Sequence, residues 1–310
     1  MIINKMVITG ATSSLGCALI DECIKNNTKV LALVNPGSKN IDRISKSDLV
    51  EIRECSLEDI ASLEVDPVKD KAEALVHLAW GATHGDSERN KVQPQAMNIK
   101  YSLDAVDLAK KLGCEVFVGA GSQAEYGRKD EDLVEDTIAT PETPYGIAKL
   151  AAGQLTRIAC KDKGIRHIWP RILSTYGPKY LMGTVVNYTI VELLNGRRPS
   201  LSKGEQIWDF LYNEDAARAL YLLAKKGRDG EVYLIGSGHG EPLSNYLLKI
   251  RDIINPSLEV GLGDKPYGEN TVMHLSCDIS KLKKDTGFEP QISFEEGIKR
   301  TIEWISEQNY

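Results

Sequence analysis

Short apolar segments alternate with helical patterns along the first half of the chain, and this alternation constrains the fold more than any other feature. Segments rich in Val, Ile and Leu occur at residues 5–10, 29–35, 49–55, 74–80 and 115–121, and residues 15–27 and 102–113 carry helical patterns between them. Nearly continuous apolar strands separated by helices are typical of a parallel sheet covered on both faces. We therefore expect an α/β fold with a doubly wound parallel sheet of the Rossmann type, to which residues 166–173 add a sixth strand.

The alternation ends after Tyr176. Residues 184–196, 243–255 and 293–308 have helical patterns, and residues 209–227 read as a short strand followed by a helix. We expect a second, smaller domain over the carboxyl edge of the sheet. The first domain would comprise residues 1–173 and 209–250, and the substrate-binding second domain residues 174–208 and 251–310. Ligands are expected in the cleft between them.

Composition excludes several classes of protein. The 310 residues carry a net charge of −6, which argues against a broad surface for nucleic acid or for an anionic membrane. No stretch approaches the roughly 20 apolar residues of a membrane span, and the apolar run at the start is too short for a signal peptide. Six scattered cysteines and five histidines lack metal-ligand spacing. We expect a cytoplasmic protein without a bound metal.

The first strand leads into the sequence TGATSSLG, in which Gly10, Ser13 and Gly16 are three residues apart as a helix begins. Gly10 permits a tight turn, the helix start offers free N–H groups, and Gly16 lets helix and strand approach closely. Serine at position 13 replaces the commoner glycine. We predict that this loop, with Ser14 and Leu15, binds the pyrophosphate of a dinucleotide; the alternative is a purely structural turn.

The end of the second strand bears on the choice of cofactor. It finishes with Val34 and Asn35, without the acid that accepts a hydrogen bond from the ribose 2′-hydroxyl of NAD. Ser38 and Lys39 follow, and both suit a 2′-phosphate. We therefore favour NADP(H), with NAD(H) as the alternative if residues 35–40 form only a polar turn.

Tyr145 and Lys149 lie four residues apart in the sequence ETPYGIAKLA. Thr143 suits a helix cap and Pro144 a first helical turn, so the two side chains would share one face of a helix. An ammonium beside a phenol favours the phenolate and brings proton transfer toward neutral pH. The alternative is an ordinary surface pair, and the rest of the chain has to decide.

Three segments, FVGAGSQAEYG, ETPYGIAK and PRILSTYGP, have the order and spacing of one family. The chain resembles the extended short-chain dehydrogenase/reductases, in particular the nucleotide-sugar epimerase, dehydratase and reductase group. The resemblance covers nearly the whole chain and rests on the Gly10 loop, HLAW at residues 77–80, Asn98, Ser122 and the Tyr-x-x-x-Lys motif.

The resemblance implies a role for each matching residue. Ser122 would bind the reacting oxygen of the substrate, Tyr145 would be the general acid and base, and Lys149 would lower the pKa of that tyrosine and bind the nicotinamide ribose. Asn98 would support the site from the preceding helix. Further cofactor contacts are expected from Ser56, Leu57, Leu78, Ala79, Trp80, Ile172 and Leu173. Substrate contacts are expected from Gly81, Thr83, Ser122, Gln123, Ser174 and Trp208.

Three positions depart from the family pattern. Ser56 stands where an aspartate often binds the adenine amine, Ser174 replaces the usual asparagine two residues before Tyr176, and Trp208 replaces an arginine that commonly grips the substrate phosphates. The nucleotide half of the substrate is therefore expected to be held differently, or to be a different nucleotide.

The family chemistry exchanges a hydride between nicotinamide and a sugar carbon, usually C4, while the tyrosine moves the hydroxyl proton. We favour a C4 reductase that uses NADPH on a 4-keto-6-deoxyhexose nucleotide, with a 4-epimerase holding NAD as the alternative. A 4,6-dehydratase would need an Asp-Glu pair where Gln123 and Ala124 follow Ser122. Retention of all three catalytic residues argues against a non-catalytic dinucleotide sensor. Polysaccharide precursors are the expected setting.

Family members often dimerise through two helices, here around residues 93–112 and 145–163. Ala148, Ala151, Ala152 and Leu155 form a stripe of small and apolar residues at helical spacing. This stripe would pack against a second copy of the chain, or else belong to the chain's own core.

Overall fold

A computed structural model describes residues 1–83, 85–180 and 183–308. Its centre is a parallel sheet in the order β3-β2-β1-β4-β5-β7-β12, in which β6 continues alongside β7 after β5 ends. The strands are β1 (Lys5–Thr9), β2 (Lys29–Val34), β3 (Val50–Glu54), β4 (Ala74–His77), β5 (Val116–Gly119), β6 (Gly121–Ser122), β7 (Arg166–Ile172) and β12 (Glu231–Ile235). The order reverses between β1 and β4, where doubly wound sheets bind ligands.

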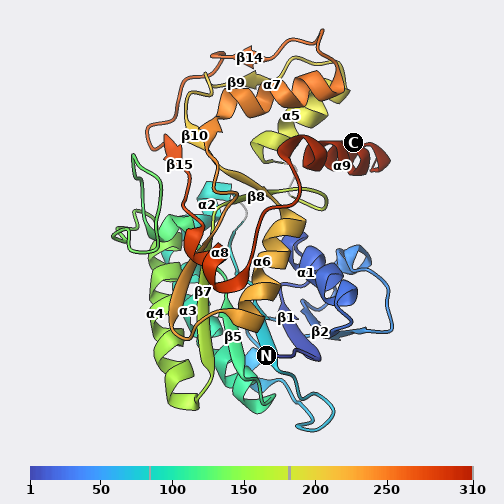
Figure 1. Cartoon of the computed structure of the whole chain (residues 1–310), viewed down its shortest axis with the longest axis vertical. Coiled ribbons are helices and arrows are strands. Elements are labelled where there is room, and N and C mark those ends of the chain that lie inside the picture. Colours follow the sequence, from blue (N-terminus) through green and yellow to red (C-terminus); the bar gives the residue numbers. More distant parts are fainter. Residues whose placement is uncertain (84, 181–182, 309–310) are drawn as a thin grey trace.

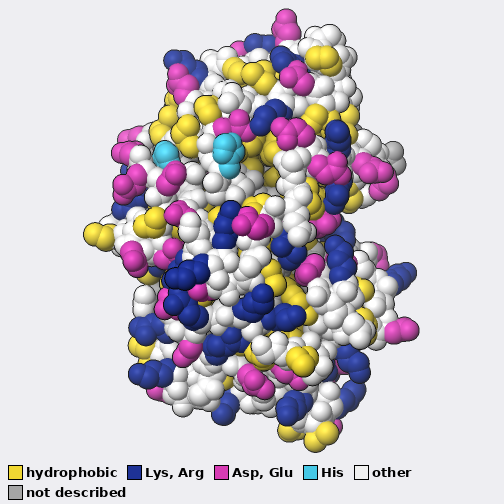
Figure 2. Space-filling view, in the orientation of Figure 1, with side chains coloured by type: hydrophobic (Ala, Val, Ile, Leu, Met, Phe, Trp, Pro, Cys, Tyr) yellow, Lys and Arg dark blue, Asp and Glu magenta, His cyan; other side chains and the backbone are white. Residues whose placement is uncertain are grey.

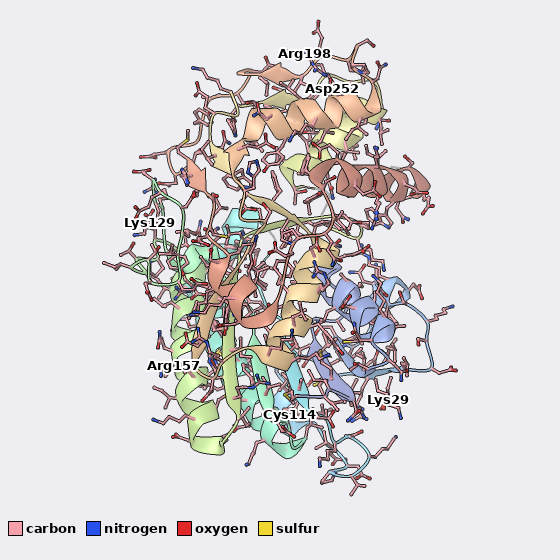
Figure 3. All side chains as sticks on the ribbon, viewed as in Figure 1. Lys29, Cys114, Lys129, Arg157, Arg198 and Asp252 are labelled. Carbon is pink, nitrogen blue, oxygen red and sulfur yellow. The ribbon has the colours of Figure 1, made fainter. Side chains whose placement is uncertain are left out.

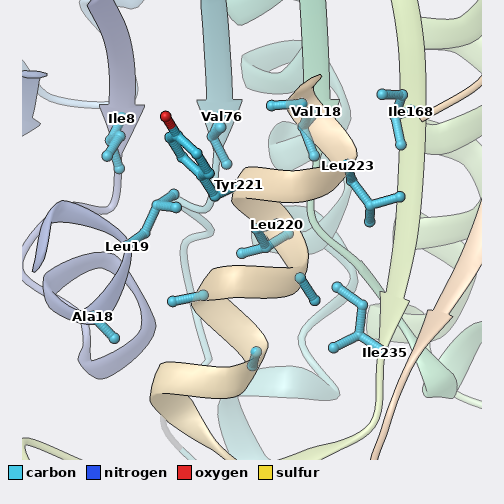
Figure 4. Packing of buried hydrophobic residues seen from close by; sticks show 14 of the residues in the cluster. Ile8, Ala18, Leu19, Val76, Val118, Ile168, Leu220, Tyr221, Leu223 and Ile235 are labelled. Carbon is cyan, nitrogen blue, oxygen red and sulfur yellow. The ribbon is translucent and has the colours of Figure 1, made fainter. Parts of the chain in front are cut away.

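Helices cover both faces of this sheet. One face carries α1 (Ser14–Lys25), α6 (Asn213–Lys226) and α8 (Ser280–Thr286), and the other carries α3 (Val92–Lys111) and α4 (Pro144–Lys163) (Figure 1). Figure 4 shows Leu220 and Leu223 of α6 lying over strand residues such as Val118. Because successive residues of a strand face opposite sides, Met6 and Ile8 join the first core and Val7 joins the second. The expected doubly wound fold is confirmed.

Pro170 lies inside a central strand, where its missing N–H would normally break a ladder. On one side, β7 pairs with β5 up to Ile168 and with β6 from Arg171 onward. The proline therefore stands where one partner strand gives way to the next, and no hydrogen bond on that side is lost.

Most of the remaining elements pack around a core of their own away from the sheet, and we call this part of the molecule the second domain. They are β8 (Ser174–Tyr176), α5 (Val185–Leu194), β9 (Ser200–Leu201), β10 (Ile207–Trp208), β11 (Phe210–Tyr212), β13 (Glu241–Pro242), α7 (Leu243–Ile254), β14 (Gly261–Leu262), β15 (His274–Leu275) and α9 (Phe294–Glu307). Their core is aromatic: Phe210 and Phe294 each contact the rings of both Tyr176 and Tyr246. Figure 3 places Arg198 and Asp252 of this domain at the opposite end of the molecule from Lys29 and Cys114.

Packing divides the chain differently from the expected boundaries at two helices. Helix α7, of which residues 243–250 were expected in the first domain, packs against α5 and α9 through residues that include Tyr246 and Leu247. Helix α8, expected in the second, packs against α6 and β12 through Leu282. Each helix has one apolar face, and residues distant in the sequence bury that face.

The surface carries both signs of charge. On the face in Figure 2, Lys and Arg side chains are more frequent over the lower half, which holds the sheet, and acidic side chains are interspersed with them. None of the described helices combines the length and apolarity needed to cross a membrane. The six cysteines are buried free thiols.

Candidate active site

Ser122, Tyr145 and Lys149 meet at the carboxyl edge of the sheet. Ser122 ends β6, and Tyr145 is the second residue of α4, whose start is capped by Thr143 and begins with Pro144 as the sequence predicts. The Ser122 side chain lies beside the Tyr145 phenol and acts to lower the pKa of that phenol, and Lys149 Nζ lies 5.8 Å from the centre of the tyrosine ring. The pair is therefore part of a built site and is not an ordinary surface pair.

The net electrostatic effect on Tyr145 differs from the expectation. Burial raises the pKa of its phenol, and the neighbouring Ser122 hydroxyl and the Arg89 charge only partly offset this. The predicted lowering of the pKa by Lys149 therefore does not prevail over burial. The Lys149 ammonium has other partners. Its Nζ donates to the Ala120 carbonyl at 2.7 Å and lies 3.6 Å from the centre of the Trp80 ring.

Lys149 is itself a perturbed group, with only 4% of its surface exposed. Burial lowers the pKa of its ammonium to about 7; the Glu125 carboxylate opposes this shift and the Arg89 guanidinium reinforces it. Perturbed titratable groups in a cleft are typical of catalytic sites.

Glu125 is a buried carboxylate whose role the sequence reasoning missed. Its Oε1 accepts hydrogen bonds from the Ser122 N–H and from Trp169 Nε1, both at 2.9 Å, and its Oε2 accepts one from Arg171 Nε at 2.6 Å. The Ser-x-x-Glu spacing of a capping box was the signal that could have found it. Glu125 fixes the backbone of Ser122 and is completely buried, so its carboxylate is not exposed to a substrate.

The glycine loop after β1 has the form of a pyrophosphate cradle. Gly10 has a left-handed φ of 69°, and a Cβ there would lie 2.7 Å from the Ala79 nitrogen; a Cβ on Gly16 would lie 2.4 Å from the Gly10 oxygen. Ser13 caps α1, accepting from Gly16 N at 3.0 Å, and the first turn holds no acid. An anion fits this helix start.

The two residues that follow Ser13 face away from the loop. Ser14 Oγ donates to the Pro178 carbonyl at 2.8 Å and accepts from Asn213 Nδ2 at 2.9 Å, while Leu15 packs against the first core. Ser14 and Leu15 can therefore bind a phosphate only through their backbone N–H groups. The loop is also tied to the start of the second domain.

A carboxylate does stand near the end of β2, but it comes from β3. Glu54 is in register with Val34, and its Oε1 accepts the Gly37 N–H at 3.1 Å. Lys39 is exposed, and Ser38 Oγ accepts the Asn40 N–H at 3.3 Å. Reading β2 alone could not reveal Glu54.

A second carboxylate lies beside Ser56, where the family pattern has an acid. Ser56 Oγ donates to Asp59 Oδ2 at 2.6 Å, and Leu57 packs against the second core. Asp59 thus brings an acid to the edge of the sheet three residues later than expected.

The segment after β4 is clamped by α3. Gly81 N donates to Asn98 Oδ1 at 2.7 Å, and Asn98 Nδ2 donates back to Gly81 O at 3.0 Å. Leu78 and Ala79 are held by the Thr9 carbonyl and hydroxyl. Trp80 Nε1 donates to Gln95 Oε1 at 2.8 Å, a contact absent from our expectations. Asn98 therefore fixes the backbone of Gly81, and Thr83 lies half-buried beyond it.

The remaining expected residues face the second domain. Ile172 is in register with Ser122, followed by Leu173, and Gln123 opens the turn after Ser122. Trp208 Nε1 donates to Ser174 Oγ at 2.9 Å. A cavity of about 460 Å³ opens within this domain, lined by Tyr188, Leu201, Gln206, Lys265 and Tyr267 among others. Within the described residues, no three His, Cys, Asp or Glu side chains gather as metal ligands.

A doubly wound sheet with a glycine cradle and a Ser-Tyr-Lys centre defines a dinucleotide-dependent oxidoreductase. Residues 6–236 match the profile of the NAD dependent epimerase/dehydratase family. A dTDP-glucose 4,6-dehydratase of Escherichia coli is 35% identical, with 97% of this chain and 93% of that protein covered. The chain therefore belongs to the NAD-dependent epimerase/dehydratase family of extended short-chain dehydrogenase/reductases, enzymes that act on nucleotide sugars.

Two solved structures share the fold over 99% of this chain and all of theirs. The UDP-N-acetylglucosamine 4-epimerase from Methanobrevibacter ruminantium, in complex with UDP-N-acetylmuramic acid, has a TM-score of 0.87 at 24% identity. The UDP-glucuronic acid 4-epimerase from Bacillus cereus, in complex with UDP-glucuronic acid and NAD, has a TM-score of 0.83 at 22% identity.

Proposed function

We propose that this enzyme is a C4 reductase of a 4-keto-6-deoxyhexose nucleotide and uses NADPH. The observation that carries the proposal is the state of the groups around Ser122. The proton donor Tyr145 is held in its protonated form by burial, which suits the reduction of a carbonyl. The acids that elimination requires are missing, because Gln123 and Ala124 follow Ser122 and the next carboxylate, Glu125, is bound to Arg171.

The residues present fit a nicotinamide dinucleotide. The Gly10 and Gly16 cradle and the start of α1 would hold its pyrophosphate, with Leu78 and Ala79 along the groove. When bound, the reduced cofactor supplies the hydride. Ser122 would hold the substrate oxygen by a hydrogen bond, Tyr145 would give it the phenolic proton, and the Lys149 ammonium would stabilise the phenolate that remains.

Exposed Lys39 and the lack of an acid on β2 support NADPH. Glu54 supports the second candidate, a 4-epimerase that keeps NAD bound, because its carboxylate lies near the end of β2 where it would disfavour a 2′-phosphate. The NAD in the Bacillus cereus structure agrees with this candidate.

The test offers the purified protein the substrates of both candidate reactions. Identification of any dinucleotide released on denaturation comes first. NADPH consumption is then followed with 4-keto-6-deoxyhexoses carried on dTDP, GDP and CDP, and conversion of UDP-glucose to UDP-galactose is followed without added cofactor. Reduction by an initially empty protein supports the reductase; stoichiometric bound NAD with C4 inversion replaces it by the epimerase. Tyr145→Phe should abolish either turnover and leave dinucleotide binding intact.

We also infer a homodimer, through a surface that shares only Leu155 with the expected stripe. Ala148 and Ala152 are 3% and 0% exposed and belong to the chain's own packing. Leu155 is exposed, together with Ile147 and Ile158 on α4. These three side chains are spaced to line one helical face, which suits a second copy of the chain. The six buried free thiols agree with the cytoplasm as the compartment.

A further inference from the structure

We propose that Trp80 is a positioning residue of the reaction centre, whose indole face holds the Lys149 ammonium in place and in its charged form. The proposed function gives the reason why this charge is needed, and in that respect the inference rests on it. The contact itself depends on neither cofactor nor substrate.

The contact between the two side chains is close. Lys149 Nζ lies 3.6 Å from the centre of the Trp80 ring, and the ring of Tyr145 meets the indole edge-on with centres 6.1 Å apart. An ammonium over an indole face is attracted by the negative face of the ring, and the attraction is strongest where water is excluded. Lys149 is almost completely buried.

The indole is fixed independently of the lysine. Its Nε1 donates to Gln95 Oε1 at 2.8 Å, and Gln95 Nε2 donates to the Ala82 carbonyl at 2.8 Å. Gln95 is buried in the first turn of α3. Because both the oxygen and the nitrogen of the Gln95 amide are hydrogen-bonded within the protein, the orientation of the Trp80 ring does not depend on a bound ligand.

The other groups around Lys149 do not secure its charge. Glu125 of the turn after Ser122 favours the ammonium, but that carboxylate is already paired with Arg171. Arg89 of α2 (Gly85–Arg89) disfavours it, and burial disfavours it most. Among the other titratable groups that the structure describes here, His77 is held neutral by burial and Tyr145 is held protonated. The indole therefore supplies attraction that the charged neighbours do not.

This charge has a function in the proposed direction of reaction. In that direction Tyr145 gives its proton to the substrate oxygen, and the phenolate that remains would be stabilised by the Lys149 ammonium together with the positive charge of the oxidised nicotinamide. A neutral amine at position 149 would remove the protein's share of this stabilisation.

The experiment measures the titration of Lys149 directly. Protein labelled with ¹³C at lysine Cε is titrated by NMR, and the Lys149 signal is assigned by its loss in Lys149→Met. We expect Trp80→Leu to lower the midpoint by about one pH unit, a roughly tenfold change in the acid dissociation constant. Trp80→Phe should lower it less, because a benzene ring attracts a cation more weakly. Trp304→Phe in α9, a similar replacement outside the site, should not change it.

Coincident titrations of the wild type and both Trp80 variants would overturn the inference. If Trp80→Leu does not fold, Trp80→Phe and Gln95→Met decide the matter, since the second frees the ring while keeping it present. The titration needs no substrate, so a failure of sugar reduction leaves this result unaffected, and the two proposals fail separately.

Discussion

Trp208 Nε1 donates a hydrogen bond to Ser174 Oγ at 2.9 Å, which joins two of the positions at which the chain departs from its family's pattern. The indole has a single donor, and that donor is used inside the protein. Position 208 therefore provides an aromatic ring where the family pattern has a cation. The residues at positions 174 and 208 act together.

This coupling predicts non-additive variants. Trp208→Phe and Ser174→Ala should each raise the KM for the nucleotide sugar several-fold with little effect on kcat, because each removes the hydrogen bond that fixes the ring at position 208 without touching Tyr145. The double variant should be no worse than either single one, with a coupling energy of about 1 kcal/mol. Steady-state kinetics of the three variants measure it. Additive effects would show that the bond has no role in binding.

Gly16→Ala should abolish dinucleotide binding and destabilise the protein. The new Cβ would lie 2.4 Å from the Gly10 carbonyl oxygen, so the helix start would have to move away from the strand. Gly164→Ala is the matched control: it ends α4 with a φ of 67° and open space around it. It should cost about 1–2 kcal/mol of stability and leave NADPH affinity unchanged. Fluorescence titration with NADPH and urea unfolding separate the two effects.

Glu125→Gln should destabilise the fold by about 3–5 kcal/mol, because it leaves the buried Arg171 guanidinium without its countercharge. The control is Glu142→Gln, which breaks the exposed pair with Arg128 and should cost less than about 1 kcal/mol. Equal losses in urea unfolding would mean that the buried pair contributes no more than a surface one.

His77 should make the fold sensitive to acid. Burial lowers the pKa of its imidazole from 6.5 to about 3, so the folded state accepts only the neutral form. The stability associated with the neutral ring is fully present above pH 6.5 and is lost as the pH falls from 6.5 toward 3. In His77→Asn, the amide retains a partner for Thr9 but does not titrate.

The stability difference between wild type and His77→Asn should therefore shrink as the pH falls from 7.5 to 4.5 in urea unfolding. His167, whose pKa burial lowers to about 4, is present in both proteins and cancels in the comparison. A difference that stays constant with pH would rule out titration of His77 in this range.

The proposed dimer surface can be tested with charge. Ile147→Glu combined with Ile158→Glu should convert the protein to a monomer in light scattering, because buried unpaired carboxylates oppose association. Ile138→Glu, at an equally apolar side chain that is 76% exposed outside α4, should leave the mass unchanged. A wild-type protein that is already monomeric contradicts the proposal.

Local patterns were sufficient to predict the sheet and most of its helices, because the apolar runs of β1, β2, β4 and β5 are buried on both faces. The cap of α4 and the position of Tyr145 on it also followed from neighbouring residues. These features depend on sequence separations of a few residues, for which helix and strand periods are reliable guides.

Features set by residues far apart in the chain were not predictable. Glu54 reaches the end of β2 only because β3 pairs beside it, and the apolar face of α7 gave no sign of its partners α5 and α9. The side of α4 that Ala148 and Ala152 face depends on the neighbours of that helix. The direction of the shift in the pKa of Tyr145 likewise depends on burial by the whole fold.

The repeated passage of the chain between its two parts limits how the molecule can open. The chain leaves the sheet after Ile172, returns to it with α6 at Asn213, leaves after Ile235 and returns at Cys277 before ending in α9. Rotation of one lobe against the other would bend every one of these crossings at once, unlike a hinge at a single linker. Ligand exchange should therefore proceed by displacement of individual loops, and substitutions in those loops should change residence times more than substitutions at the crossings.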